Sequence, residues 1–365
     1  MRESLTPWWM LPPAGGIPDA PTEQAMGGCP PGGGCNPAMQ NAGMPALLRP
    51  SLHLVLTLAL ASVLIFASLE LLPGHAAALM LGPDAAPDAV QALSRELGLD
   101  QPPWLRYGQW IAGLLQGELG QSYAYRTPVA PMLAERLRLS LPLSGLALAL
   151  TVLASLALGL LAAARRGRWV DALLLGLSQL GLALPAFWFG MGLMWLFAVR
   201  LQWLPAGGFP GWDAELGGGW GPAVLALLLP ALALALTQTA LLARLLRASL
   251  LDVLQEDYVR AARARGLSEG RVLLRHVLRN ALVPVLTQLG TQFAGLLAGA
   301  VLIETLFQLP GLGQLIAQAI ANRDLIVVRN AVMLLVTLVL LLNWAVDLLN
   351  TWLDPRLRRP EAGHG

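Results

Sequence analysis

The sequence predicts an all-α membrane protein that crosses the bilayer about six times. Hydrophobic residues make up 56% of the 365 residues and charged residues only 13%, whereas roughly a quarter of the residues in soluble domains are charged. Polar segments separate six apolar runs, each of which reaches the about 18 residues that a membrane helix needs. The expected spans lie near Leu52–Leu72, Ser140–Ala164, Val170–Val199, Ala223–Leu246, Val283–Ile303 and Asn330–Leu353.

The third run contains Pro185, which lacks a backbone donor and therefore predicts a kink or a break. An even number of spans places both termini on one side of the membrane. Arginine marks that side, because short loops rich in Arg stay in the cytoplasm. The loop Arg165–Arg168 alone holds three arginines, and 15 lie on one predicted side against eight on the other. Both termini are therefore expected in the cytoplasm.

The chain divides by composition into three parts. Residues 1–45 are rich in Pro, Gly and Met and lack an apolar run, so they are expected to be a disordered extension. This extension is either a true tail or the result of a start assigned too far upstream, because Met44 precedes the first apolar run. Residues 46–359 form the membrane domain, with 73–139 expected outside and 247–283 inside, and residues 360–365 form a tail.

The most informative segment is a polar island between two spans, from Arg247 to Pro284. Glu256 precedes Arg260 by four residues, a spacing that supports a helix through an ion pair. Gly266 then suits a left-handed helix end, and Ser268 can cap the next helix. The island is therefore expected to be a cytoplasmic helix–Gly–helix that a soluble partner grips. The alternative is a basic loop that merely lies against anionic lipid.

The island resembles the EAA loop of ABC importer permeases, the loop that docks the ATPase subunit. Arg260-Ala261-Ala262, followed after three residues by Gly266, has the frame of that loop. Two departures, Arg260 in place of Glu and Leu278-Arg279 in place of Leu-Pro, are shared by the branch for dipeptides, oligopeptides and nickel. Further similar motifs are Leu97–Pro102, Gly117–Ser122, Trp203–Ala206, Ile303–Phe307, Pro310–Gly313 and Leu353–Arg356. His75 stands where this branch usually has Asp, in the motif Pro73-Gly74-His75.

The resemblance implies a type I ABC importer permease that forms half of a peptide translocation path across the cell inner membrane. Nickel or another small solute is the alternative substrate. The implied partners are a homologous second permease, two ATP-binding subunits, an extracytoplasmic solute-binding protein and the lipid bilayer, and no nucleic acid is expected. The residues implied in ATPase coupling are Tyr258, Arg260, Ala261, Ala262, Arg263, Gly266, Arg271 and Arg275.

The sequence offers no catalytic chemistry. All 24 basic residues are Arg, so the chain has no lysine for a phosphate-binding P-loop, and ATP must be bound by another chain. The four histidines are scattered, so no catalytic residue, metal or cofactor is expected. Acids inside membrane spans are candidates for a substrate path, which here means Glu70, Glu304 and Asp347. The plainer interpretation is that the first two reach water at a span end and that Asp347 faces a partner subunit.

Two other classes of membrane protein fit less well. A secondary transporter or channel tends to show internal repeats and a clustered ion site, but the polar island has no second copy and the acids are dispersed. An intramembrane enzyme needs a nucleophile and a base, and the sequence suggests no such pair. The sequence therefore favours the ABC importer permease and leaves its substrate open.

Overall fold

The computed structural model describes residues 48–71, 76–82, 84–96, 98 and 100–353. The predicted extension 1–45, the tail 360–365 and the motif Pro73–His75 lie outside them. The regular elements of the described part are helices, apart from one isolated bridge between Gln121 and Pro128, which confirms the all-α class. In chain order they are α1 (Leu48–Glu70), α2 (Ala76–Leu81), α3 (Pro87–Glu96), α4 (Pro103–Gln116), α5 (Val129–Ala164), α6 (Trp169–Ala183), α7 (Ala186–Leu193), η3 (Met194–Arg200), η4 (Ala214–Leu216), α8 (Trp220–Val253), α9 (Asp257–Ala264), α10 (Glu269–Arg271), η5 (Val272–Val277), α11 (Leu278–Leu306), α12 (Leu312–Ala321) and α13 (Leu325–Leu353).

Six membrane spans are present in the described part if one bent pair of helices counts as a single span. Five continuous helical segments are long and apolar enough to cross a bilayer, and the sixth span is α6 followed by α7 and η3. The chain bends by 104° between α6 and α7. Pro185 lies at this bend and precedes the first residue of α7, which confirms the predicted break.

Several helices are longer than the apolar runs from which their spans were predicted. The second span begins at Val129, not near Ser140, because α5 continues through the polar residues Glu135 and Arg136. The fourth span likewise runs from Trp220 to Val253. Hydropathy locates the part of a helix that meets lipid, whereas backbone hydrogen bonding continues into the polar boundary on either side.

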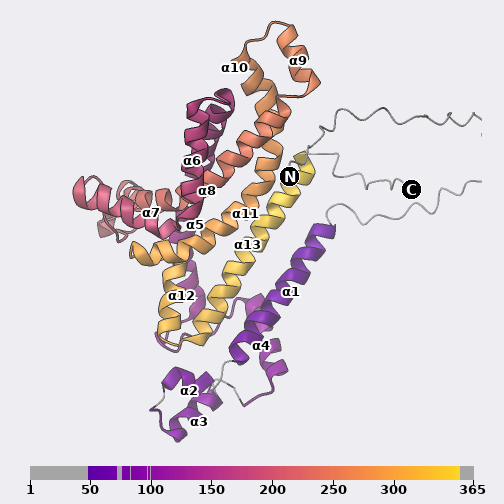
Figure 1. Ribbon diagram of the computed structural model, residues 1–365. Helices are drawn as coiled ribbons and strands as arrows, with labels where there is room; N and C mark the ends of the chain where they lie inside the picture. The colour runs from indigo at the N-terminus through magenta and orange to yellow at the C-terminus, as the bar shows by residue number, and fades with distance from the viewer. Residues whose placement is uncertain (1–47, 72–75, 83, 97, 99, 354–365) are drawn as a thin grey trace, which may run out of the picture. The chain divides into compact units, whose positions relative to one another are not determined.

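The core of the membrane domain lies where α5, α8 and α11 meet. Leu143, Leu229, Leu296 and Phe307 are fully buried there. Small residues bring the helices close: a side chain at Gly159 would collide with Leu246 of α8. Figure 1 shows α1 lying along α13 at the edge of this bundle. Little of α1 is buried, so most of its surface is left for lipid.

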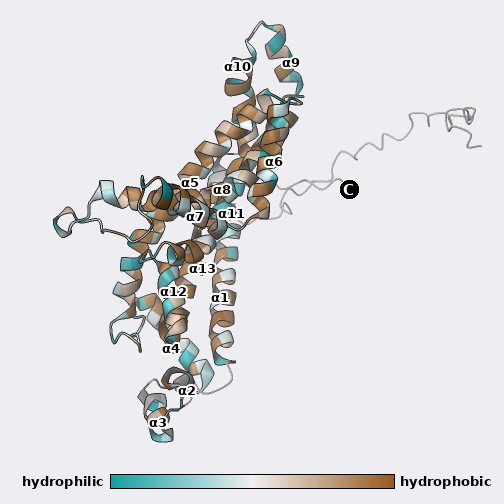
Figure 2. Ribbon diagram, turned by 60° about the vertical axis from the view of Figure 1, so that its left-hand side comes forward, coloured by the Kyte–Doolittle hydropathy of each residue, from teal (hydrophilic) through white to brown (hydrophobic). Residues whose placement is uncertain are grey.

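Polar contacts join the segment between α1 and α5 to the start of α13. Trp110 of α4 donates its indole N–H to Asn330 at 2.9 Å. The buried carboxylate of Asp324 accepts hydrogen bonds from the Ser122 hydroxyl at 2.5 Å and from the Ala124 amide at 3.1 Å. Figure 2 shows α2 to α4 at one end of the helices and α9 with α10 at the other.

Candidate coupling site

The polar island forms the predicted pair of short helices, α9 and α10, around a left-handed residue. Gly266 has φ +80°, which confirms the left-handed conformation expected of it. The amide of Gly266 donates to the Arg263 carbonyl at 2.9 Å and the amide of Leu267 donates to the Ala262 carbonyl at 3.4 Å. These two bonds make a Schellman motif that satisfies the last carbonyls of α9. A Cβ at Gly266 would meet no atom within 4 Å, so backbone conformation, not space, favours glycine here.

One face of α9 is anchored to the membrane domain. Val259 is 0% exposed and Ala262 is 1% exposed. They pack with Leu246 and Leu250 of α8 and with Val272 of η5. The helix therefore packs on the adjoining ends of α8 and η5 through a small apolar core, and its opposite face is left to the solvent.

Polar contacts join α9 to α10 and to the start of α11. The Arg263 guanidinium donates to both carboxylate oxygens of Glu269, at 2.9 and 3.1 Å, across the turn at Gly266. Tyr258 of α9 accepts a hydrogen bond from the Asn280 amide of α11 at 2.6 Å. The loop therefore has a defined shape that a partner can recognise.

Two predicted local interactions are wrong. Arg260 pairs with Asp257 at 3.3 Å and not with Glu256. Glu256 has extended backbone and precedes the first helical residue, so it is not on the helix face that a spacing of four residues requires. Ser268 stands at the cap position of α10, but its side chain makes no capping bond. Its carbonyl accepts the Val272 amide at 3.0 Å instead.

The structure exposes most of the residues assigned to ATPase coupling. Those that reach solvent are Tyr258, Arg260, Ala261, Arg263, Gly266, Arg271 and Arg275. Ala262 is the exception, because its methyl group is buried against the chain's own core. Its assignment to a partner contact is corrected: Ala262 anchors α9, and Ala261 is the small residue that faces outward.

The three acids proposed for a translocation path are not brought together. Glu70 ends α1 and forms an ion pair with Arg106 of α4. Asp347 is exposed on α13. Glu304 lies near the end of α11 and is 0% exposed. Each acid is on a different helix, so the three do not form one substrate site in the described residues.

Glu304 clamps three helices together. It accepts hydrogen bonds from the Ser140 hydroxyl of α5 at 2.6 Å and from the Gly313 amide of α12 at 2.7 Å. The same Ser140 oxygen accepts the Leu312 amide at 2.8 Å. A Cβ at Gly311 would collide with the Glu304 carboxylate, which explains the glycine of that motif. The oxygens of Glu304 are buried and bonded within the chain, so the structure gives it a bonding role between helices, and its assignment to a substrate path stays a prediction.

Sequence reasoning missed the ion pair that holds α6 on α8. Asp171 accepts bonds from the Arg247 guanidinium, at 2.7 Å to each oxygen, and from the Gly167 amide at 3.0 Å. Asp171 is the only acid between Trp169 and Arg200 in the sequence, and an isolated acid in an apolar run was the signal available.

Comparison with known proteins adds the family. Residues 155–359 match the family described as "Binding-protein-dependent transport system inner membrane component", and residues 44–144 match its N-terminal membrane component. A Brucella abortus protein named as a peptide transport system permease is 43% identical over 298 residues, which are 81% of this chain and 93% of that protein. The glutathione transport system permease protein of Escherichia coli and a Sinorhizobium fredii protein named as a peptide ABC transporter permease are each 38% identical over 312 residues, which are 86% of this chain and 98% of theirs.

Proposed function

Because this chain belongs to the inner membrane components of binding-protein-dependent transport systems, we propose that it forms half of a translocation path completed by a homologous second permease. The family consists of permease subunits of ABC importers, so this chain is a transport subunit and not an enzyme. ATP hydrolysis takes place in separate ATPase subunits, and solute is delivered by a binding protein. Two ATPase copies per transporter complete the proposed assembly.

The substrate class is peptides. The similar proteins carry names for peptide and glutathione transport, and glutathione is itself a short peptide. The translocation path then lies between the two permeases and not inside this chain. This arrangement agrees with the scattered positions of Glu70 and Asp347 and with the burial of Glu304.

The main support for a role of α9 in ATPase coupling is that one face of this helix is packed against the chain and the other is exposed. Its apolar face is fixed to α8 and η5, whereas its solvent face presents Ala261 beside Arg260 and Arg263. A small residue permits close approach to a groove, and the two exposed arginines can exchange Asp257 and Glu269 for carboxylates on its rim. Contact that differs by a few kcal/mol between two ATPase states is enough to shift the permease between inward-facing and outward-facing forms.

The proposed orientation follows from the same loop. With α9 and α10 in the cytoplasm, the exposed loop Arg165–Arg168 is cytoplasmic and the segment from α2 to α4 is outside. Both termini are then cytoplasmic. This orientation agrees with the tendency of arginine-rich short loops to remain inside.

Transport is tested in proteoliposomes that contain both permeases and both ATPase subunits. We expect uptake of a labelled dipeptide or oligopeptide that requires ATP and loaded binding protein. A matched preparation without ATPase subunits serves as the control. ATP-driven uptake of nickel without uptake of any peptide would overturn the substrate assignment while leaving the importer assignment in place.

Docking is tested by cross-linking from single cysteines after Cys29 and Cys35 are replaced by Ser. A cysteine at Ala261, on the solvent face of α9, is expected to cross-link to an ATPase subunit. The matched control is Asn322→Cys, which is exposed after α12. Cross-linking from Asn322 but not from Ala261 would contradict the proposed docking face.

A further inference from the structure

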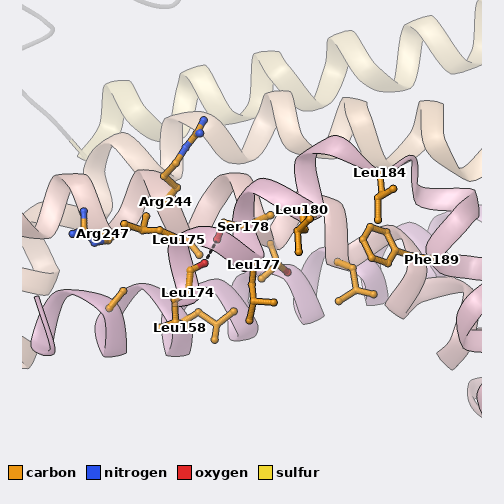
Figure 3. A pocket seen from close by; sticks show the side chains of 16 residues that line it. Leu158, Leu174, Leu175, Leu177, Ser178, Leu180, Leu184, Phe189, Arg244 and Arg247 are labelled. Atoms are coloured by element: carbon orange, nitrogen blue, oxygen red, sulfur yellow. Dashed lines mark hydrogen bonds between the residues drawn. The ribbon is translucent and has the colours of Figure 1, made fainter. Parts of the chain in front are cut away.

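A pocket of about 400 Å³ lies between α5, α6, α7 and α8, and its lining includes Arg247, the first residue of the polar island, but no residue of α9 or α10. Figure 3 shows the two arginines of its lining at one end, and Leu184 with Phe189 at the other. Between these ends the labelled lining side chains are leucines and one serine, Ser178. Ser178 donates its hydroxyl to the Leu174 carbonyl at 2.8 Å, so its polar group is satisfied within α6. The pocket is therefore an apolar channel with a cationic end.

The pocket remains open because α6 touches α8 closely at only some positions. The Asp171–Arg247 ion pair holds the start of α6, and Gly181 meets Ala240 so closely that an added Cβ would lie 2.9 Å from the alanine methyl. Leu177 and Leu180 line the pocket and are also exposed. In a membrane these exposed leucines would face lipid, so the pocket opens sideways to the bilayer.

Near the start of α6, arginines outnumber the one acid, Asp171, that pairs with them. Asp171 neutralises Arg247. Arg244, almost one turn earlier on α8, is exposed and makes no ion pair or hydrogen bond with any described residue. Arg165, Arg166 and Arg168 are also exposed, in the short loop that leads into α6. Cations thus gather at the end of the pocket that the proposed orientation places at the cytoplasmic surface.

We propose that this pocket binds an anionic phospholipid of the cytoplasmic leaflet, with an acyl chain along α6 and the phosphate near Arg244. The wall from Leu174 to Leu184 is about 15 Å long at 1.5 Å per residue, which suits an extended chain. Basic pockets between spans on the cytoplasmic side are suited to anionic headgroups.

The bound lipid would support α6 where protein contacts are sparse. Its chain would cover Leu177 and Leu180, and its phosphate would add an anion beside Arg244 without disturbing the Asp171–Arg247 pair. A zwitterionic lipid with the same chains would fill the pocket but would bring its own cation toward the arginines. Preference for the anionic headgroup is therefore the property that identifies this site.

The test uses the assembled transporter in nanodiscs, with a benzophenone amino acid in place of Leu177. Illumination in phosphatidylglycerol is expected to give a lipid adduct of this chain, at higher yield than in phosphatidylcholine with the same chains. Arg244→Gln should lower the affinity for phosphatidylglycerol about fivefold when the two lipids are titrated against each other. Arg279→Gln, at an exposed arginine outside the pocket, is the matched control and should leave the relative affinity for the two lipids unchanged.

A second variant distinguishes lipid bound inside the pocket from lipid attracted to the arginine-rich surface in general. Ser178→Phe fills the pocket from α6 and should lower the adduct yield with both lipids, while the transporter still assembles. Equal yields in the two lipids, together with no effect of Arg244→Gln, would overturn the proposal. An adduct with the second permease instead of a lipid would overturn it as well, and would assign this face to the interface between permeases.

Discussion

Asp171 and Arg247 form a two-pronged ion pair that joins the first turn of α6 to the C-terminal part of α8, with 2.7 Å between each oxygen and its nitrogen. Asp171 is buried and Arg247 is mostly covered, so neither group can turn to water if its partner is lost. The pair thus holds the first turn of α6 against α8.

Asp171→Asn should destabilise the protein by on the order of 2 kcal/mol, because Arg247 would remain partly buried without an anion. The double variant Asp171→Asn with Arg247→Gln should lose less stability than the two single variants lose together. The expected coupling free energy is on the order of 1 kcal/mol. Thermal unfolding in detergent, followed by tryptophan fluorescence, measures both. The control is Asp257→Asn, which removes the exposed pair with Arg260 and should change stability by less than about 1 kcal/mol. Strict additivity of the two changes would show that the pair is not coupled.

Gly313→Ala should destabilise the junction of α11 and α12. The added methyl group would collide with the backbone of Val301 and crowd the Glu304 carboxylate, so α12 would have to move away from α11. Overpacking of this kind costs about 1–3 kcal/mol, seen as a lower midpoint of thermal unfolding. Gly192→Ala is the matched control, because a Cβ there meets nothing within 4 Å. Equal unfolding midpoints for the two variants would argue against the Glu304 clamp.

Substitutions at Gly266 should follow backbone conformation and not side-chain size. Gly266→Asn should retain ATPase association, because Asn tolerates a positive φ, whereas Gly266→Val should lose ATPase association and transport together. Expression and membrane insertion should be unchanged, since no atom lies within 4 Å of the added Cβ. Gly270→Val, at a glycine without a positive φ, is the control. Normal transport by Gly266→Val would remove the basis for the coupling turn.

Topology is checked by labelling single cysteines in intact spheroplasts, after Cys29 and Cys35 are replaced by Ser. Cysteines at Gln91 and Asn322 should react with an impermeant thiol reagent. Cysteines at Gly167 and Ser268 should react only after the membrane is opened. All four positions are exposed in the structure, so access to them depends on the side of the membrane and not on burial. Labelling of Ser268 from outside would invert the proposed orientation.

Features encoded within a short stretch of chain could be predicted from the sequence. Pro185 broke its span because proline lacks a donor, and Gly266 adopted a positive φ because glycine permits it. The burial of Ala262 was also open to prediction, since Val259 and Ala262 are three residues apart on one face of a short helix.

Pairings between distant residues could not be predicted in the same way. Ser140 and Glu304 are 164 residues apart, and Asp171 and Arg247 are 76 residues apart. A single sequence shows that each is a polar residue in an apolar run, but not which other residue it meets. Glu304 therefore looked like a substrate contact until its hydrogen-bond partners were known. Its unusual position was visible in the sequence, whereas its bonding partners were not.

The backbone is helical without interruption from Glu269 to Leu306, a stretch of 38 residues that includes the π-helical turns of η5. At 1.5 Å per residue this stretch is about 57 Å long. Under the proposed orientation this stretch can be regarded as a lever whose inner end begins beside the Gly266 turn and whose outer end carries Glu304, bonded to α12. If the lever pivots at its inner end, a tilt of about 5° displaces the outer end by about 5 Å, by the geometry of a rod of this length. Under the proposed orientation, a small tilt of this stretch would therefore move Glu304, together with its bonded partners on α5 and α12, at the end opposite the Gly266 turn.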